Sequence, residues 1–268
     1  MSFRSLTIKE AAPRIFRRPT LCVSPSDSLI QVVTFLATGP QIYADGLVVL
    51  DGKRLAGRIG GYTLATHILH TRERWLEGKA ADIIETIARP LQETDPVGKA
   101  LEIFARTRFA FMPVVSGEQV VASLSIRDLL RAAGGMEQKA GSLASRLITI
   151  DDDASVVDAL EFMVERGVRN LVSMEREDPY VINDRKVLGY MFGLKTRERI
   201  SMIGFDDLEK VKLPSLGLTR GRQIDPEISS YEAARLLSDV ETSCLFAGDK
   251  ILTPWDLVMK GSGFIDKA

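Results

Sequence analysis

Two short stretches of the chain place a hydroxyl group and a carboxylate three residues apart, directly before an apolar helical run. They are Ser125-Ile126-Arg127-Asp128 and Thr253-Pro254-Trp255-Asp256. This spacing is typical of a helix start, where the hydroxyl residue caps the helix and the acid reaches back to the cap. A helix start also offers unpaired N–H groups and a positive dipole end. The residue types therefore fit two roles, capping a helix and binding a ligand.

The elements that must position these residues recur four times along the chain. In each repeat a short apolar run is followed by Asp, Ser or Pro and then by a helical pattern with apolar residues at i, i+3, i+4 and i+7. Two strand-like runs and a second helical pattern come next. Each repeat therefore predicts strand, helix, strand, strand, helix, which is too small to bury its own faces, so we expect the repeats to pair. The first helices align at Leu29, Val97, Val156 and Ser230.

In the third repeat we predict the two central strands at "NLVSME" and "KVLGYMFG", separated by the polar loop "REDPYVINDR", with "LKTRERISMI" as the second helix. On this alignment the first and third repeats lack one or both of the polar groups that the second and fourth keep. Their equivalent positions are Gly60-Gly61-Tyr62-Thr63 and Phe192-Gly193-Leu194-Lys195.

A glycine-rich segment from Ala132 to Ser142 lies between the second and third repeats and predicts a boundary. We expect two domains, residues 1–134 and residues 135–268. The first domain begins with a short arm in which five basic residues face only Glu10. We expect this arm to be solvated, with contact to phosphates as the alternative.

The repeats resemble the CBS motif, which occurs in pairs known as Bateman modules. The second repeat carries the resemblance best, with its "MPVV" strand and with Ser125 to Asp128 at the end of the next strand. The resemblance extends from about Arg18 to Lys260. It implies an α+β fold of four CBS units, paired into two Bateman modules and stacked as a disc. The arrangement is similar to that of the nucleotide-sensing gamma subunit of AMP-activated protein kinase.

The resemblance also implies which residues contact a ligand. In the family, the hydroxyl residue and the acid three residues on contact the ribose of an adenosine nucleotide, because a carboxylate can accept two hydrogen bonds from a cis-diol. Here these residues are Ser125, Asp128, Thr253 and Asp256. Further residues are expected near the phosphates or the base, with a solvated surface role as the alternative: Arg89, Arg169, Asn170, Lys195 and Arg222. Ala110 and Phe111 stand where the family often has basic residues, which weakens the case for a triphosphate in the second repeat.

These features predict a regulatory protein and not an enzyme. The repeats occupy nearly the whole chain, and the sequence contains none of the common nucleotide-binding or hydrolase motifs. AMP or ADP is the expected ligand, ATP is possible, and the ligand's presence would be signalled to a partner protein. The alternatives are an S-adenosylmethionine sensor and a ligand-independent scaffold or oligomerisation protein. A homodimer is possible.

Composition and charge bear on three other classes: nucleic-acid-binding, membrane and metal-binding proteins. Lys plus Arg (35) nearly balance Asp plus Glu (36), so no overall positive field favours nucleic acid. No apolar run approaches the roughly 18 residues that span a bilayer, which predicts a soluble, cytoplasmic protein without a membrane partner. His67 and His70 share one face of a predicted helix, but no further ligand accompanies them, so we expect no metal site.

Overall fold

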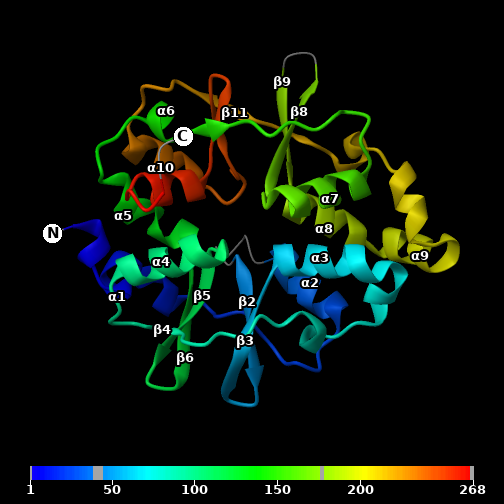
Figure 1. Ribbon diagram of the computed structural model, residues 1–268, viewed down its shortest axis with the longest axis horizontal. Coiled ribbons are helices and arrows are strands. Elements are labelled where there is room, and N and C mark those ends of the chain that lie inside the picture. The colour runs from blue at the N-terminus through cyan, green and yellow to red at the C-terminus, as the bar shows by residue number, and fades with distance from the viewer. Residues whose placement is uncertain (1, 39–44, 176–177, 266–268) are drawn as a thin grey trace.

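The computed structural model describes residues 2–38, 45–175 and 178–265. Viewed down its shortest axis, the molecule has the round outline of a disc (Figure 1). The N-terminal half of the chain forms one side of the disc, and the C-terminal half forms the other. Four small sheets and the helices beside them make an α+β fold of four repeats, as predicted.

Unit 1 has the predicted order of strand, helix, strand, strand, helix. Strand β1 pairs in parallel with β2, and β2 pairs antiparallel with β3. The turn between β2 and β3 contains Gly52 at a φ of 62°, a left-handed conformation that glycine adopts without strain. The elements are β1 (Cys22–Val23), α2 (Leu29–Thr38), β2 (Gly46–Asp51), β3 (Arg54–Gly60) and α3 (Gly61–Thr71).

Unit 2 repeats this pairing. Its first helix buries Val97, Ala100, Leu101 and Phe104, the i, i+3, i+4 and i+7 positions of the predicted apolar face. The elements are β4 (Leu91–Gln92), α4 (Val97–Thr107), β5 (Phe111–Ser116), β6 (Gln119–Ser125), η6 (Ile126–Leu129) and α5 (Leu130–Gly134).

Unit 3 differs from the prediction in its second half. The segment predicted as the strand "KVLGYMFG" lies in helix α8 except for its last residue, and the predicted loop supplies strand β9 instead. The reason is local, because the side chain of Asn183 accepts a hydrogen bond from the backbone of Lys186 and starts the helix there. Its first strand is reduced to a single parallel bridge between Thr149 and Val172. The elements are α7 (Val156–Arg166), β8 (Asn170–Glu175), β9 (Asp178–Asn183), α8 (Asp184–Phe192) and α9 (Leu194–Ile203).

Unit 4 again has the predicted order, and a short strand that precedes unit 3, β7 (Ser145–Arg146), joins its sheet. The first helices of the four units begin at the four positions that the sequence predicted. The elements of unit 4 are β11 (Arg222–Ile224), α10 (Ser230–Leu237), β12 (Leu245–Ala247), β13 (Lys250–Leu252) and η9 (Asp256–Lys260).

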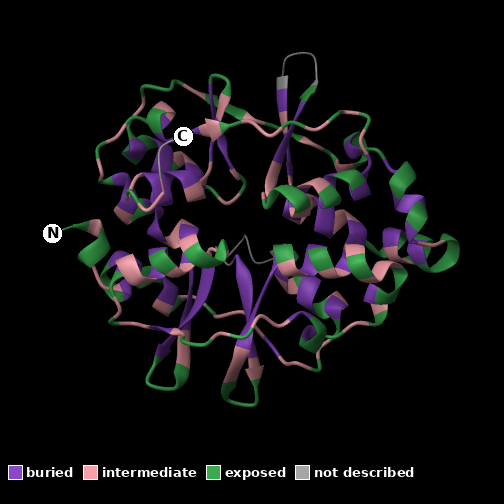
Figure 2. Cartoon of the chain, viewed as in Figure 1, coloured by how far each residue is buried: buried purple, intermediate pink, exposed green. Residues whose placement is uncertain are grey.

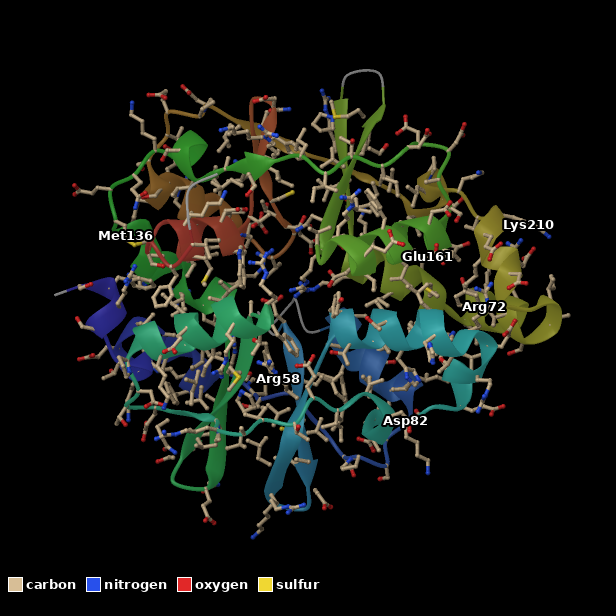
Figure 3. The ribbon with its side chains drawn as sticks, viewed as in Figure 1. Arg58, Arg72, Asp82, Met136, Glu161 and Lys210 are labelled. Atoms are coloured by element: carbon tan, nitrogen blue, oxygen red, sulfur yellow. The ribbon has the colours of Figure 1, made fainter. Side chains whose placement is uncertain are left out.

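Short segments connect the units. At the edge of the disc, Arg72 forms ion pairs with Asp206 and Glu209, which fastens the end of unit 1 to the segment after unit 3 (Figure 3). The connecting elements are η4 (Arg72–Glu77), η5 (Ala80–Ile83), α6 (Ala140–Leu143), η7 (Phe205–Lys210), η8 (Leu213–Leu216) and β10 (Thr219–Arg220).

The N-terminal segment is folded, so the expectation of a solvated arm is wrong. It contains η1 (Phe3–Ser5), α1 (Ile8–Ala11) and η2 (Pro13–Arg17). Ile8, Ala11, Ala12 and Ile15 are buried in the same core as the helices of unit 2, whereas Arg4, Lys9, Arg14 and Arg17 are exposed. We call residues 3–18 the N-terminal strap.

The hydrophobic core crosses the disc. One cluster of buried side chains joins units 1 and 3, and another joins units 2 and 4 with the strap. Strands β2, β3, β5 and β6 are accordingly buried over most of their length and exposed at their turn ends (Figure 2). Within the N-terminal half, Arg58 of β3 donates a hydrogen bond to the carbonyl of Phe111 in β5 (Figure 3). The division at residues 134 and 135 stays a prediction.

Candidate functional site

The sheet registers show which residues are equivalent among the units. Ser125 at the end of β6 pairs with the first residue of β5, and Gly60 and Asn183 end β3 and β9 in the same register. The four residues from this strand end onward form a tetrad in units 1, 2 and 3, and in unit 4 the tetrad Thr253–Asp256 begins one residue after β13 ends. In unit 3 the tetrad is therefore Asn183-Asp184-Arg185-Lys186, so the alignment that placed Lys195 at this position is wrong. Lys195 lies on α9 and is exposed.

In unit 2 the acid of the tetrad is already occupied. Both oxygens of Asp128 accept hydrogen bonds from the guanidinium of Arg18, at 2.7 and 2.8 Å, and one also accepts from the backbone N–H of Ser125 at 2.7 Å. The side chains of Arg18 and Asp128 are 14% and 7% exposed. Asp128 therefore caps the helix, as the spacing predicted, and holds the last residue of the strap as well.

Burial raises the pKa of Asp128 to about 6, although the charge and hydrogen bonds of Arg18 and the Ser125 N–H act to lower it. The hydroxyl of Ser125 is also engaged, because it accepts the backbone N–H of Asp45 at 3.0 Å. Asp45 precedes β2, so this bond links unit 2 to unit 1.

In unit 4 the acid is equally buried but has different partners. Asp256 accepts hydrogen bonds from the backbone N–H of Thr253 at 3.0 Å, from its hydroxyl at 2.6 Å, and from the hydroxyl of Ser145. The ammonium of Lys260, on a side chain only 4% exposed, lies 3.4 Å from the carboxylate. Thr253 and Asp256 therefore form a helix start that is locked by a buried ion pair.

The first and third units carry other residue types at the fourth position. In unit 1 the hydroxyl of Thr63 donates to Glu85 at 2.8 Å. In unit 3 the ammonium of Lys186 donates to the carbonyl of Gly217 and, at 2.6 Å, to Thr219. Unit 1 has glycine where unit 2 has Ser125, because a Cβ on Gly60 would lie 2.2 Å from the ring of Phe109.

One rule covers all four units. The fourth tetrad residue contacts the segment that leads into the first strand of the other unit in the same half of the disc. We call the residues that precede the first strand of a unit its lead-in segment. The four contacts are Thr63 with Glu85, Asp128 with Arg18, Lys186 with Thr219, and Asp256 with Ser145.

The third tetrad residue reaches across the disc. Arg127 of unit 2 donates to the carbonyls of Leu237 and Thr242, at and beyond the end of α10 in unit 4, at 2.8 and 3.0 Å. Tyr62 of unit 1 donates to the carbonyl of Val164 near the end of α7 in unit 3. The third tetrad residues of units 3 and 4 also contact the opposite half of the disc. Arg185 of unit 3 is bonded to Asp45 of unit 1, and the guanidinium of Arg108 in unit 2 lies over the ring of Trp255 in unit 4. Each tetrad therefore joins a helix start, a lead-in segment and the opposite half.

Opposite charges meet near the centre of the disc. Asp45, which is 6% exposed, pairs with Arg185 and lies 3.5 Å from Arg169, and Arg169 also pairs with Asp184 at 2.7 Å. Burial would raise the pKa of Asp45, but the charges of Arg185, Arg169 and Arg127 together lower it below its ordinary value. These residues line a cavity of about 10 Å³, room for about one water molecule. The cavity is therefore too small for any molecule larger than water.

The other predicted ligand residues are scattered. Arg169 belongs to the central charge cluster, and Asn170 begins β8 and is half-buried. Arg89 and Arg222 are exposed, as Lys195 is, which fits the surface role held as the alternative. Sequence reasoning missed the partners of the tetrads. Of these, Lys260 had a local signal, because it lies four residues after Asp256 on the same helical face.

The sequence predicted neither a metal site nor a membrane-spanning helix. Among residues 2–38, 45–175 and 178–265, no group of three or more His, Cys, Asp or Glu side chains could hold a metal ion. Within the same ranges, no helix combines the length and the apolar character that crossing a membrane requires.

Comparisons with known proteins agree with the repeated architecture. The family model described as "CBS domain" matches residues 80–135 and 140–190. Protein MJ1225 from Methanocaldococcus jannaschii has a similar structure, with a TM-score of 0.78 and 14% identity, over 94% of this chain and 99% of that chain. A conserved protein from Pyrococcus horikoshii is similar at a TM-score of 0.54 and 13% identity, over 91% and 96% of the two chains. A search of curated proteins found no match.

The two matched segments cover units 2 and 3 up to the helix that follows each pair of central strands. Units 1 and 4 repeat the same order of elements, and the likeness to MJ1225 extends over almost the whole chain. The chain therefore contains CBS domains at residues 80–135 and 140–190, within a fold that repeats the same order of elements in four units.

Proposed function

We propose that this protein is a non-catalytic regulator that binds adenosine-containing ligands at the junctions of its CBS units and signals their presence to a partner protein. The observation that carries the proposal is the carboxylate of Asp128, whose two oxygens accept two parallel N–H bonds from one guanidinium. The two hydroxyls of a ribose cis-diol would offer donors to the same pair of oxygens. Asp256 is the second candidate ribose contact.

The ligand class follows from the chemistry of the junctions and from the fold. MJ1225, which shares the fold over nearly its whole length, is described as a proposed archaeal homologue of g-AMPK. AMP or ADP is our first choice, because one or two phosphates can be met by the arginines around Asp45, and ATP is possible. The cavity there is closed, so a ligand shifts the disc only as far as it binds the opened arrangement better.

A second candidate function is a ligand-independent scaffold. It is favoured by the finding that the fourth residue of every tetrad is paired with the chain's own lead-in segments. In that case the tetrads hold the disc together and bind nothing else. S-adenosylmethionine, which also carries a ribose, remains an alternative ligand within the first proposal.

A thermal-shift titration separates these functions. The ligands are AMP, ADP, ATP and S-adenosylmethionine, with GMP as the control for the base, and the proteins are wild type, Asp128→Ala, Asp256→Ala and the double variant. We expect an adenosine ligand at about a hundred times its dissociation constant to stabilise wild type by about 2.7 kcal/mol. Each single variant should lose part of this effect.

Asp158→Ala is the matched control, because Asp158 also caps a helix, accepting the N–H of Ser155 at 2.7 Å, but lies outside the tetrads. It should lower the baseline stability and keep the full ligand-induced shift. If no adenosine ligand stabilises wild type, the sensor proposal is wrong and the scaffold is favoured.

A further inference from the structure

The ion pair between Arg18 and Asp128 closes the proposed ribose contact of unit 2 from within the chain. Besides its two bonds to the carboxylate, the guanidinium donates to the carbonyl of Ser123 at 3.0 Å, so Arg18 lies along the end of β6. Both oxygens of Asp128 are used, and one also serves the N–H of Ser125. A cis-diol and Arg18 cannot occupy this carboxylate together.

Arg18 is also the last residue of the N-terminal strap. The strap adds main-chain hydrogen bonds to unit 2, from Ile8 N–H to the carbonyl of Asp95 and from Lys9 N–H to that of Glu93. At its other end, Arg4 donates to the carbonyl of Ser262 at 2.8 Å and lies over the ring of Phe264. The strap therefore runs from the junction of unit 2 to the segment that follows η9 of unit 4.

We infer that Arg18 is an internal competitor of the ligand at Asp128, so that a ribose ligand binding there releases the N-terminal strap. This inference rests on the proposed function and names the regulation of the same site. The strap covers apolar side chains of units 2 and 4, and its release would expose them, which gives the protein a ligand-dependent surface.

In unit 4 the acid of the tetrad is paired with residues outside the N-terminal strap. Its acid is held by Ser145 and by Lys260 of its own helix, and neither belongs to the strap. Arg18 is 14% exposed and lies close to the surface, so its guanidinium can turn to solvent, whereas Lys260 is 4% exposed. Ligand binding at Asp128 is therefore the event that is coupled to the strap.

The test compares wild type with Arg18→Met, which removes the competing charge and keeps an apolar stem. Arg17→Met is the matched control, because it removes the same charge from a neighbouring, exposed residue of the strap. Isothermal titration with AMP measures affinity. Hydrogen exchange at the amides of Ile8 and Lys9 reports whether the strap is docked, since each donates a main-chain hydrogen bond to unit 2.

We expect Arg18→Met to bind AMP about tenfold more tightly than wild type, because AMP no longer has to displace the Arg18 guanidinium from Asp128. AMP should speed exchange of the strap amides in wild type. In Arg18→Met their exchange should be faster without AMP and change little on binding. Arg17→Met should match wild type in both measurements.

Three outcomes contradict the inference in distinguishable ways. Equal affinity of wild type and Arg18→Met would refute the competition while leaving the proposed function intact. Tighter binding without any change in strap exchange would refute the release of the strap. Binding of AMP by neither protein would refute AMP as the ligand at Asp128, and the absence of any shift with AMP, ADP, ATP and S-adenosylmethionine would refute the proposed function itself.

Discussion

Replacing Asp256 with alanine is expected to destabilise the protein by about 3–5 kcal/mol, the range for removing one partner of a buried ion pair. The substitution leaves the ammonium of Lys260 without its counter-charge on a side chain that is 4% exposed. It also removes the acceptor for the N–H and the hydroxyl of Thr253. Urea unfolding at neutral pH, followed by circular dichroism, measures the loss.

The control for this prediction removes both charges. In the double variant Asp256→Asn with Lys260→Met, no buried charge is left alone, so most of the lost stability should return. Asp128→Ala should cost less than Asp256→Ala, because Arg18 can reach water when its partner is removed. Equal losses for the two alanine variants, or a double variant as unstable as Asp256→Ala, would show that the buried pair is not what stabilises unit 4.

Replacing Asp45 with alanine is expected to cost about 1–2 kcal/mol at pH 7, because it removes the carboxylate that Arg169 and Arg185 share, while their side chains, 40% and 20% exposed, can reach water. Asp51→Ala is the matched control, since the side chain of Asp51 is 66% exposed and its distance to Arg54 is 4.0 Å. We expect that variant to stay within about 0.5 kcal/mol of wild type.

The pH dependence of Asp45 has a definite sign. The surrounding arginine charges hold the pKa of Asp45 below its ordinary value in the folded protein. Its contribution to stability is therefore complete above the ordinary carboxyl range, near pH 4, and is lost as the pH falls through the lowered pKa. Wild type should lose more stability than Asp45→Ala between about pH 4 and pH 2. Parallel acid profiles for the two proteins would contradict this assignment.

Much of the fold could be predicted because the repeat carries local signals. The first helices begin at Leu29, Val97, Val156 and Ser230, where a capping or turn residue precedes a periodic apolar face. The error in unit 3 arose because "PYVI" and "KVLGYMF" are both short apolar runs, which periodicity alone does not assign to strand or helix. The cap formed by Asn183 was the deciding signal.

The candidate site was predicted in part, because its contacts are of two kinds. Ser125 with Asp128 and Thr253 with Asp256 are three residues apart, so their capping geometry follows from helix geometry. Arg18 lies 110 residues from Asp128, and no local pattern joins them. Such long-range partners depend on how two units pack, which a single sequence does not show. The tetrads of units 2, 3 and 4 cap their helices, and ligand binding at Asp128 or Asp256 requires an exchange of partners.

The most direct test of this account is a crystal structure of the protein grown with AMP. The account predicts that the ribose hydroxyls lie within hydrogen-bond distance of the Asp128 carboxylate, with Arg18 displaced from it. A structure in which AMP is bound elsewhere, or in which Arg18 still holds both oxygens of Asp128, would contradict it.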